Sequence, residues 1–189
     1  MASLVLAGDT SGSITVSAPA VAGSTTQTLV NVTGTLAPVV SGTAVTASGT
    51  SVDFTGIPSW VKRITVMLNG LSYAAAGTGV VQIGSGSLST SGYTSNIVSL
   101  AAGGTNTAAQ TNGFGSIATS AAGSTINGVY TLFLVTGNTW AFTEMAFRTT
   151  DNGGINGNGF IALSGVLDRL SVVATSSSFD AGTINILYE

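Results

Sequence analysis

The sequence contains no histidine and no cysteine, and only 6 % of its 189 residues are charged. An average soluble chain has about 25 % charged residues. The net charge of this chain is −3. Without His and Cys the chain has no disulfide, no zinc or haem ligand of these types, and no Ser-His-Asp or Cys-His nucleophile. These absences exclude much of enzyme chemistry, and we expect no metal, no cofactor and no enzymatic activity.

Two further absences limit the possible partners. The chain has no basic run that would hold phosphates, so we expect no nucleic-acid partner. No apolar run approaches the roughly 18 residues of a spanning helix, so we expect no membrane insertion. Residues 1–9 include no Lys or Arg and only a short apolar stretch, which does not resemble a signal peptide. A hydrophobic share of 44 % and a positive mean hydropathy argue against disorder.

Aromatic residues are confined to the second part of the chain. All Phe, Trp and Tyr residues lie between Phe54 and Tyr188, and none occurs in residues 1–53. Aromatic side chains bury more area than others and dominate core energetics. We therefore predict an extended N-terminal arm over residues 1–50, which docks on or exchanges between subunits, and a folded domain over residues 51–189.

Short alternating segments rich in β-branched residues follow Gly-Ser and Gly-Thr turns throughout the chain, and Asn-Gly pairs provide further turn sites. The Gly137-Asn138 turn is predicted to join two of these segments in a hairpin. No helical pattern of sufficient length is present. The fold is therefore predicted to be all-β, an antiparallel β-sandwich of jelly-roll type. The predicted strands include residues 12–16, 42–46, 49–54, 62–68, 129–135, 140–148, 169–175 and 183–188.

The segment Asp151–Gly159 is unusually rich in Gly and Asn. It resembles a calcium loop, in which carboxylates and amides alternate around a cation. It contains a single carboxylate, however, and no glutamate follows at the spacing that a calcium loop requires. We therefore predict a long, flexible hairpin loop here instead of a metal site.

Two carboxylates are sufficient for glycoside hydrolysis, so a pair of the acidic residues is a candidate catalytic site. Glu144 lies in a predicted aromatic strand, where burial would raise its pKa. Local pairing of acids with cations, as in Asp168-Arg169, is the stronger interpretation, and an acid-pair glycosidase remains a minor alternative. The acids considered are Asp53, Glu144, Asp151, Asp168 and Asp180.

A few side chains are candidates for contact with a ligand or partner. Trp60 lies in a turn-like segment and is expected to be partly exposed, whereas Trp140 alternates with a neighbouring Phe and is expected in the core. Lys62 and Arg63 either begin an exposed strand or contact an anionic neighbour. The candidate contact residues are Trp60, Lys62, Arg63, Tyr73, Tyr93 and Phe114.

The low charge also bears on assembly. Natural sheets place charges on their edges to avoid pairing with other chains, and this chain has few to place. The simplest explanation is that neighbouring chains already cover its edges. We therefore expect a homo-oligomer, in particular a homotrimer, within a larger assembly.

Several segments resemble structural proteins of tailed bacteriophages. Gly8–Gly23, which reads GDTSGSITVSAPAVAG, is similar to an N-terminal segment common in those proteins. Blocks near residue 50 and near residue 180 resemble the opening and closing strands of a β-rich domain in phage fibre and virion-surface proteins. The further segments that contribute to this resemblance are 27–29, 33–35, 48–58, 61–70, 167–169 and 179–189.

The resemblance implies a non-enzymatic structural protein of the virion, assembled in the host cytoplasm. It would be a capsid decoration (cement) protein or a short tail-fibre type protein, with capsid or tail components as partners. The alternative is a receptor- or glycan-binding module of a tail fibre, with a host surface glycan as its partner. Loops around the candidate aromatic residues and residues 151–159 would then touch the host. Residues 73–128 match no part of the pattern, and receptor or lattice contacts are expected there.

Overall fold

The computed structural model describes residues 3–7, 11–17, 38–101, 103–119 and 121–189. The chain forms two compact units, residues 1–36 and residues 37–189. All extended regular elements in the described residues are β-strands, and every strand pairing is antiparallel. This confirms the predicted all-β fold class.

The first unit contains a β-hairpin. Strand β1 (Ser3–Ala7) pairs with β2 (Ser13–Ser17), with Val5 opposite Thr15. Strand β2 confirms the strand predicted at residues 12–16. The remainder of the predicted arm up to residue 37 lies outside the described residues.

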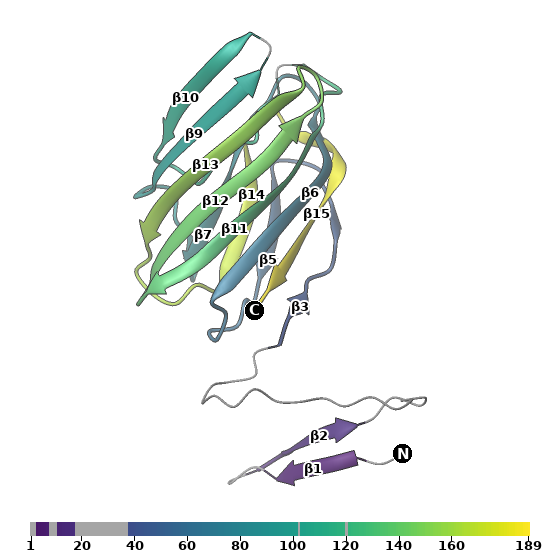
Figure 1. Cartoon of the computed structure of the whole chain (residues 1–189), viewed down its shortest axis with the longest axis vertical. Coiled ribbons are helices and arrows are strands. Elements are labelled where there is room, and N and C mark those ends of the chain that lie inside the picture. The colour runs from purple at the N-terminus through teal and green to yellow at the C-terminus, as the bar shows by residue number, and fades with distance from the viewer. Residues whose placement is uncertain (1–2, 8–10, 18–37, 102, 120) are drawn as a thin grey trace. The chain divides into compact units, whose positions relative to one another are not determined.

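The second unit is built on a nine-stranded antiparallel sheet, which we call the large sheet (Figure 1). Strands β11 (Ile126–Thr136) and β12 (Thr139–Arg148) form a hairpin across Gly137-Asn138, as predicted. The order is β10 (Gly104–Gln110), β9 (Thr94–Ala101), β13 (Gly153–Ala162), β12 (Thr139–Arg148), β11 (Ile126–Thr136), β6 (Arg63–Tyr73), β15 (Phe179–Tyr188) and β3 (Val40–Ser41), and β4 (Val45–Thr46) also pairs with β15.

A four-stranded sheet packs against the large sheet and completes the sandwich. Alternate side chains point into the core between the sheets, so that Ile64, Val66 and Leu68 of β6 are buried. Leu170 and Val172 are buried from the opposite sheet. The order of the smaller sheet is β5 (Ser51–Thr55), β14 (Arg169–Ser176), β7 (Thr78–Ser85) and β8 (Ser87–Leu88).

Residues 37–50, which were predicted to belong to the arm, are part of the sandwich unit. Strands β3 and β4 pair with β15. The side chain of Ala47 is buried, and its backbone N–H donates to the Gly182 carbonyl at 2.9 Å. The compact unit therefore begins earlier than the aromatic residues indicated, because small and β-branched residues are sufficient to cover the edge of β15.

The connection from β10 to β11 contributes to the core. Phe114 stacks on Phe142 with ring centroids 4.7 Å apart and meets Tyr93 edge-on at 4.9 Å. Its backbone also exchanges two hydrogen bonds with Val81, at 2.8 and 2.9 Å. Part of the region 73–128, where receptor or lattice contacts were expected, therefore holds the two sheets together.

Candidate functional site

Three of the predicted contact residues are core residues. Tyr73, Tyr93 and Phe114 are each at most 3 % exposed. The Tyr73 hydroxyl donates to the Ile117 carbonyl at 2.6 Å, and the Tyr93 hydroxyl donates to the Ser89 carbonyl at 3.0 Å. Tyr73 also packs against Phe179 with ring centroids 5.0 Å apart. The three predicted contact residues are therefore placed away from the surface on which a ligand would bind.

The other three predicted contact residues are partly exposed and close in sequence. Trp60 is 39 % exposed, and its ring lies 5.9 Å from the ring of Tyr188. Lys62 is exposed, and Arg63 forms an ion pair with Glu189. Trp140, in contrast, is buried. The expected difference between the two tryptophans is therefore confirmed.

The hollow beside Lys62 is small. It has a volume of about 70 Å³ and is lined by residues that include Val61, Leu134 and Val166. Known small-molecule sites have volumes of roughly 300–1,000 Å³. This end of the sandwich is therefore better suited to contact with a protein surface than to enclosing a ligand.

The Gly- and Asn-rich segment forms a strand, and the predicted hairpin loop is wrong over most of its length. Strand β13 begins at Gly153 and lies between β12 and β9. Asp151 precedes the strand, forms an ion pair with Arg148, and accepts a hydrogen bond from the Gly153 N–H at 3.1 Å. In the described part of the chain, no three acidic side chains gather into a group that would hold a metal ion.

Gly157 and Gly159 of β13 occupy positions that face the core. A Cβ atom on Gly157 would lie 2.9 Å from Glu144 Cδ, and one on Gly159 would lie 2.8 Å from Ser95 Cβ. The intervening Asn side chains point outward, so the segment alternates with a period of two. Glycine is therefore required here by close packing against neighbouring strands and not by a turn.

Glu144 is a buried carboxyl on the inner face of β12. It is 3 % exposed, and its Oε2 accepts a hydrogen bond from the Ser116 N–H at 3.1 Å. Its Oε1 has no hydrogen-bond partner among the described residues. Burial raises the pKa of Glu144 to about 8, in the direction predicted from its aromatic strand. The carboxyl is therefore mostly protonated at neutral pH.

The other acids that were considered as catalytic candidates form local contacts. Asp168 forms an ion pair with its neighbour Arg169, as predicted, and the Gly86 N–H donates to its carboxylate at 3.1 Å. The guanidinium of Arg169 lowers the pKa of Asp168. Asp53 accepts from Ser171 and Asp180 accepts from Ser72 through hydroxyl hydrogen bonds. These contacts give the exposed carboxylates a role in holding loops and strand ends.

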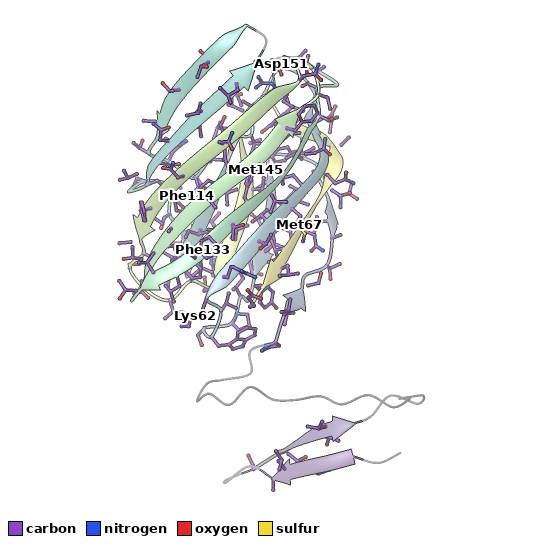
Figure 2. The ribbon with its side chains drawn as sticks, in the orientation of Figure 1. Lys62, Met67, Phe114, Phe133, Met145 and Asp151 are labelled. Carbon is purple, nitrogen blue, oxygen red and sulfur yellow. The ribbon has the colours of Figure 1, made fainter. Side chains whose placement is uncertain are left out.

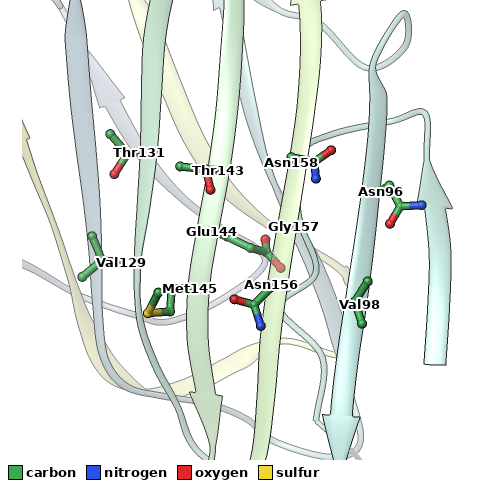
Figure 3. Close-up of a pocket in the computed structure, with 10 residues that line it drawn as sticks. All are labelled: Asn96, Val98, Val129, Thr131, Thr143, Glu144, Met145, Asn156, Gly157 and Asn158. Carbon is green, nitrogen blue, oxygen red and sulfur yellow. The ribbon is translucent and has the colours of Figure 1, made fainter. Parts of the chain in front are cut away.

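A hollow of about 510 Å³ lies on the outer face of the large sheet (Figure 3). Pairing of β11, β12, β13 and β9 sets Thr131, Thr143, Asn158 and Asn96 side by side in one row across the strands. The next row along the strands contains Val129, Met145, Asn156 and Val98. Glu144 and Gly157 complete the lining.

This hollow was not among the sites predicted from the sequence. Its residues lie at alternate positions of strands that are far apart in the chain, and the sheet order alone brings them together. The one local signal was the alternation of Gly and Asn in residues 153–159, which places Asn156 and Asn158 on one face if the segment is a strand.

We compared the chain with known protein families, with characterised proteins and with solved structures. None of them matches. Within the residues that the structure describes, no helix has the length and apolar character needed to cross a membrane. The edge strands, the exposed end near Trp60 and the outer-face hollow are the features that bear on function.

Proposed function

We propose that this chain is a non-enzymatic structural protein of a tailed bacteriophage virion, of capsid-decoration or short-fibre type. It acts as a homo-oligomer on the particle surface. The observation that carries this proposal is the edge strand β10, which is exposed along most of its length and uncharged.

Strand β10 pairs with β9 and ends the large sheet, so its other edge is open in the described structure. Six of its seven residues are exposed, because the smaller sheet does not cover it. Its sequence, GTNTAAQ, contains no charge and no proline. An open edge of this kind pairs readily with another chain unless charge, proline or a bulge protects it. An assembly in which a neighbouring subunit covers β10 accounts for this lack of protection.

Two other features support a place within a larger assembly. Trp60 and Val166 leave apolar surface exposed at 39 % and 55 %, and Val166 lines the same hollow as Lys62. The resemblance of residues 48–58, 61–70 and 179–189 to virion-surface proteins is the basis for the proposed identity of this assembly. Few charges are available to make contacts that depend on salt or pH. Contacts with few charges suit a particle that must stay assembled when the salt concentration or the pH of its surroundings changes.

Adding charge to β10 is expected to dissociate the oligomer. The parent chain should sediment as a homotrimer at micromolar concentration, and the double variant Thr107→Lys with Ala109→Lys should sediment as a monomer. Both positions are exposed, so the fold should be retained. A control with the same added charge, Ser87→Lys with Ser91→Lys, changes exposed positions outside β10 and should remain trimeric. A monomeric parent chain would contradict the proposal.

The proposed location of the protein on the virion can be tested with purified phage particles. In a host culture that produces this chain, we expect antibodies against it to label the surface of purified tailed particles in electron micrographs. The label on the head or on the tail would distinguish a decoration protein from a fibre protein. Particles that carry no label, with the chain recovered only in the soluble fraction, would overturn the virion assignment.

A further inference from the structure

We propose that the hollow on the outer face of the large sheet is a binding site for an uncharged oligosaccharide. This activity goes beyond a structural role, and it uses the outer face of the sheet and not the open backbone edge of β10. The inference rests on the arrangement of side chains across four neighbouring strands.

The centre of the hollow is a row of amide and hydroxyl groups. Thr131, Thr143, Asn158 and Asn96 are direct cross-strand neighbours, and such neighbours have Cβ atoms about 4.5–5.5 Å apart. Among the described residues, none of these side chains has a hydrogen-bond partner, although the sheet holds their backbones in place. Each Asn offers two N–H donors and one acceptor oxygen. The row therefore presents unpaired donors and acceptors at closely spaced, fixed positions.

Apolar side chains flank this polar row on both sides. On one side, Val129 and Met145 are 47 % and 72 % exposed. On the other, Phe133 and Phe160 are 41 % and 55 % exposed and lie in one cross-strand row through Ala141. Figure 2 labels Met145 and Phe133 on the large sheet. The amides and hydroxyls of the row can hydrogen-bond to sugar hydroxyls, and the exposed apolar side chains beside it can pack against the C–H groups of a sugar face.

The charge and the size of the hollow also favour a neutral sugar. No Lys, Arg or Asp lines it, and its one carboxyl, Glu144, is turned inward and mostly protonated at neutral pH. An anionic ligand would therefore find no positive charge to offset its own. The volume of about 510 Å³ lies within the range of known ligand sites.

The test uses the full chain in native gels that contain a neutral glucan, galactan or mannan, or the anionic polysaccharide alginate. We expect at least one neutral polysaccharide to retard the chain and alginate not to. Thr143→Trp fills the hollow from an exposed position and should abolish the retardation. Asn158→Ala removes one amide and should weaken binding roughly tenfold.

Two controls separate the hollow from other surfaces. Asn106→Ala removes an exposed amide of β10, outside the hollow, and Trp60→Ala removes the exposed ring at the other candidate surface. Both variants should bind as the parent chain does. No retardation by any neutral polysaccharide, or loss of binding in Trp60→Ala instead of Thr143→Trp, would overturn the proposal. A changed sedimentation coefficient in Thr143→Trp would also overturn it, because the face would then be an interface between copies.

Discussion

The Glu144→Gln variant is expected to retain at pH 9 the stability that it has at pH 5, whereas the parent chain is expected to lose stability over this range. Burial raises the pKa of Glu144 to about 8 in the folded chain. In the unfolded chain the carboxyl has its ordinary pKa near 4.3. The folded state therefore binds the proton more tightly, and its stability falls as the pH rises from about 4.5 to about 8.

The size of this loss is on the order of a few kcal/mol, because each unit of pKa difference contributes about 1.4 kcal/mol. Above pH 8 the carboxyl is ionised in both states, and no further loss from this group is expected. The glutamine amide has the same shape, remains neutral, and can still accept the hydrogen bond from Ser116. The chain has no His and no Cys, so few other groups titrate in this window.

Urea unfolding midpoints at five values between pH 5 and pH 9 would measure the effect. Glu189→Gln changes the other glutamate of the chain, which pairs with Arg63 at the surface, and should leave the pH dependence unchanged. Equal pH dependence in the parent chain and Glu144→Gln would show that Glu144 is not the group responsible. The paired acids Asp151 and Asp168 have lowered pKa values, so their contributions are lost only at more acidic pH.

Gly182→Ala is expected to destabilise the sandwich by about 3 kcal/mol or more, which is typical of severe backbone strain combined with a steric clash. Gly182 lies in β15 with φ of +103°, where the pairing with β6 shifts register. An added Cβ would lie 2.5 Å from the Cα of Leu71 and 2.6 Å from the carbonyl oxygen of Gly70. Because both atoms belong to the backbone, the clash cannot be relieved by rotating a side chain.

Gly56→Ala is the matched control for this variant. Gly56 also has a positive φ, of +73°, but a Cβ there would meet no atom within 4 Å. It should lose about 1 kcal/mol, the cost of a left-handed alanine alone. Denaturant unfolding of both variants gives the comparison. If Gly182→Ala is no less stable than Gly56→Ala, the close approach of β15 to β6 is not important for stability.

The sequence was sufficient to predict the fold class and much of the strand pattern. Alternation in residues 62–68 predicted the strand that forms most of β6, and the Gly137-Asn138 turn predicted the β11–β12 hairpin. These features depend on neighbours in the sequence. Composition alone placed the domain boundary too late, because residues 40–47 join the sandwich through pairing with a strand far along the chain.

The candidate site was harder to predict for the same reason. Tyr73, Tyr93 and Phe114 occur among Gly, Ser and Thr residues, and nothing local distinguishes a buried ring from an exposed one there. Residues 153–159 have a composition typical of turns, but hydrogen bonding to β12 and β9 on either side stabilises them as a strand. The outer-face hollow depends on the order of four strands, and a strand order is a property of the whole sheet.

The position of β15 in the large sheet has a consequence for synthesis. Strand β15 lies between β6 and the pair β3 and β4, with Tyr188 opposite Ile64 and opposite Val40. A ribosome adds roughly 5–20 residues per second, so β15 is synthesised several seconds after β6. During this time the edge of β6 that pairs with β15 remains open, and the smaller sheet that covers its inner face still lacks β14, which is also made late. We expect the sandwich to close only after β15 has left the ribosome, and nascent chains to depend on chaperones until then.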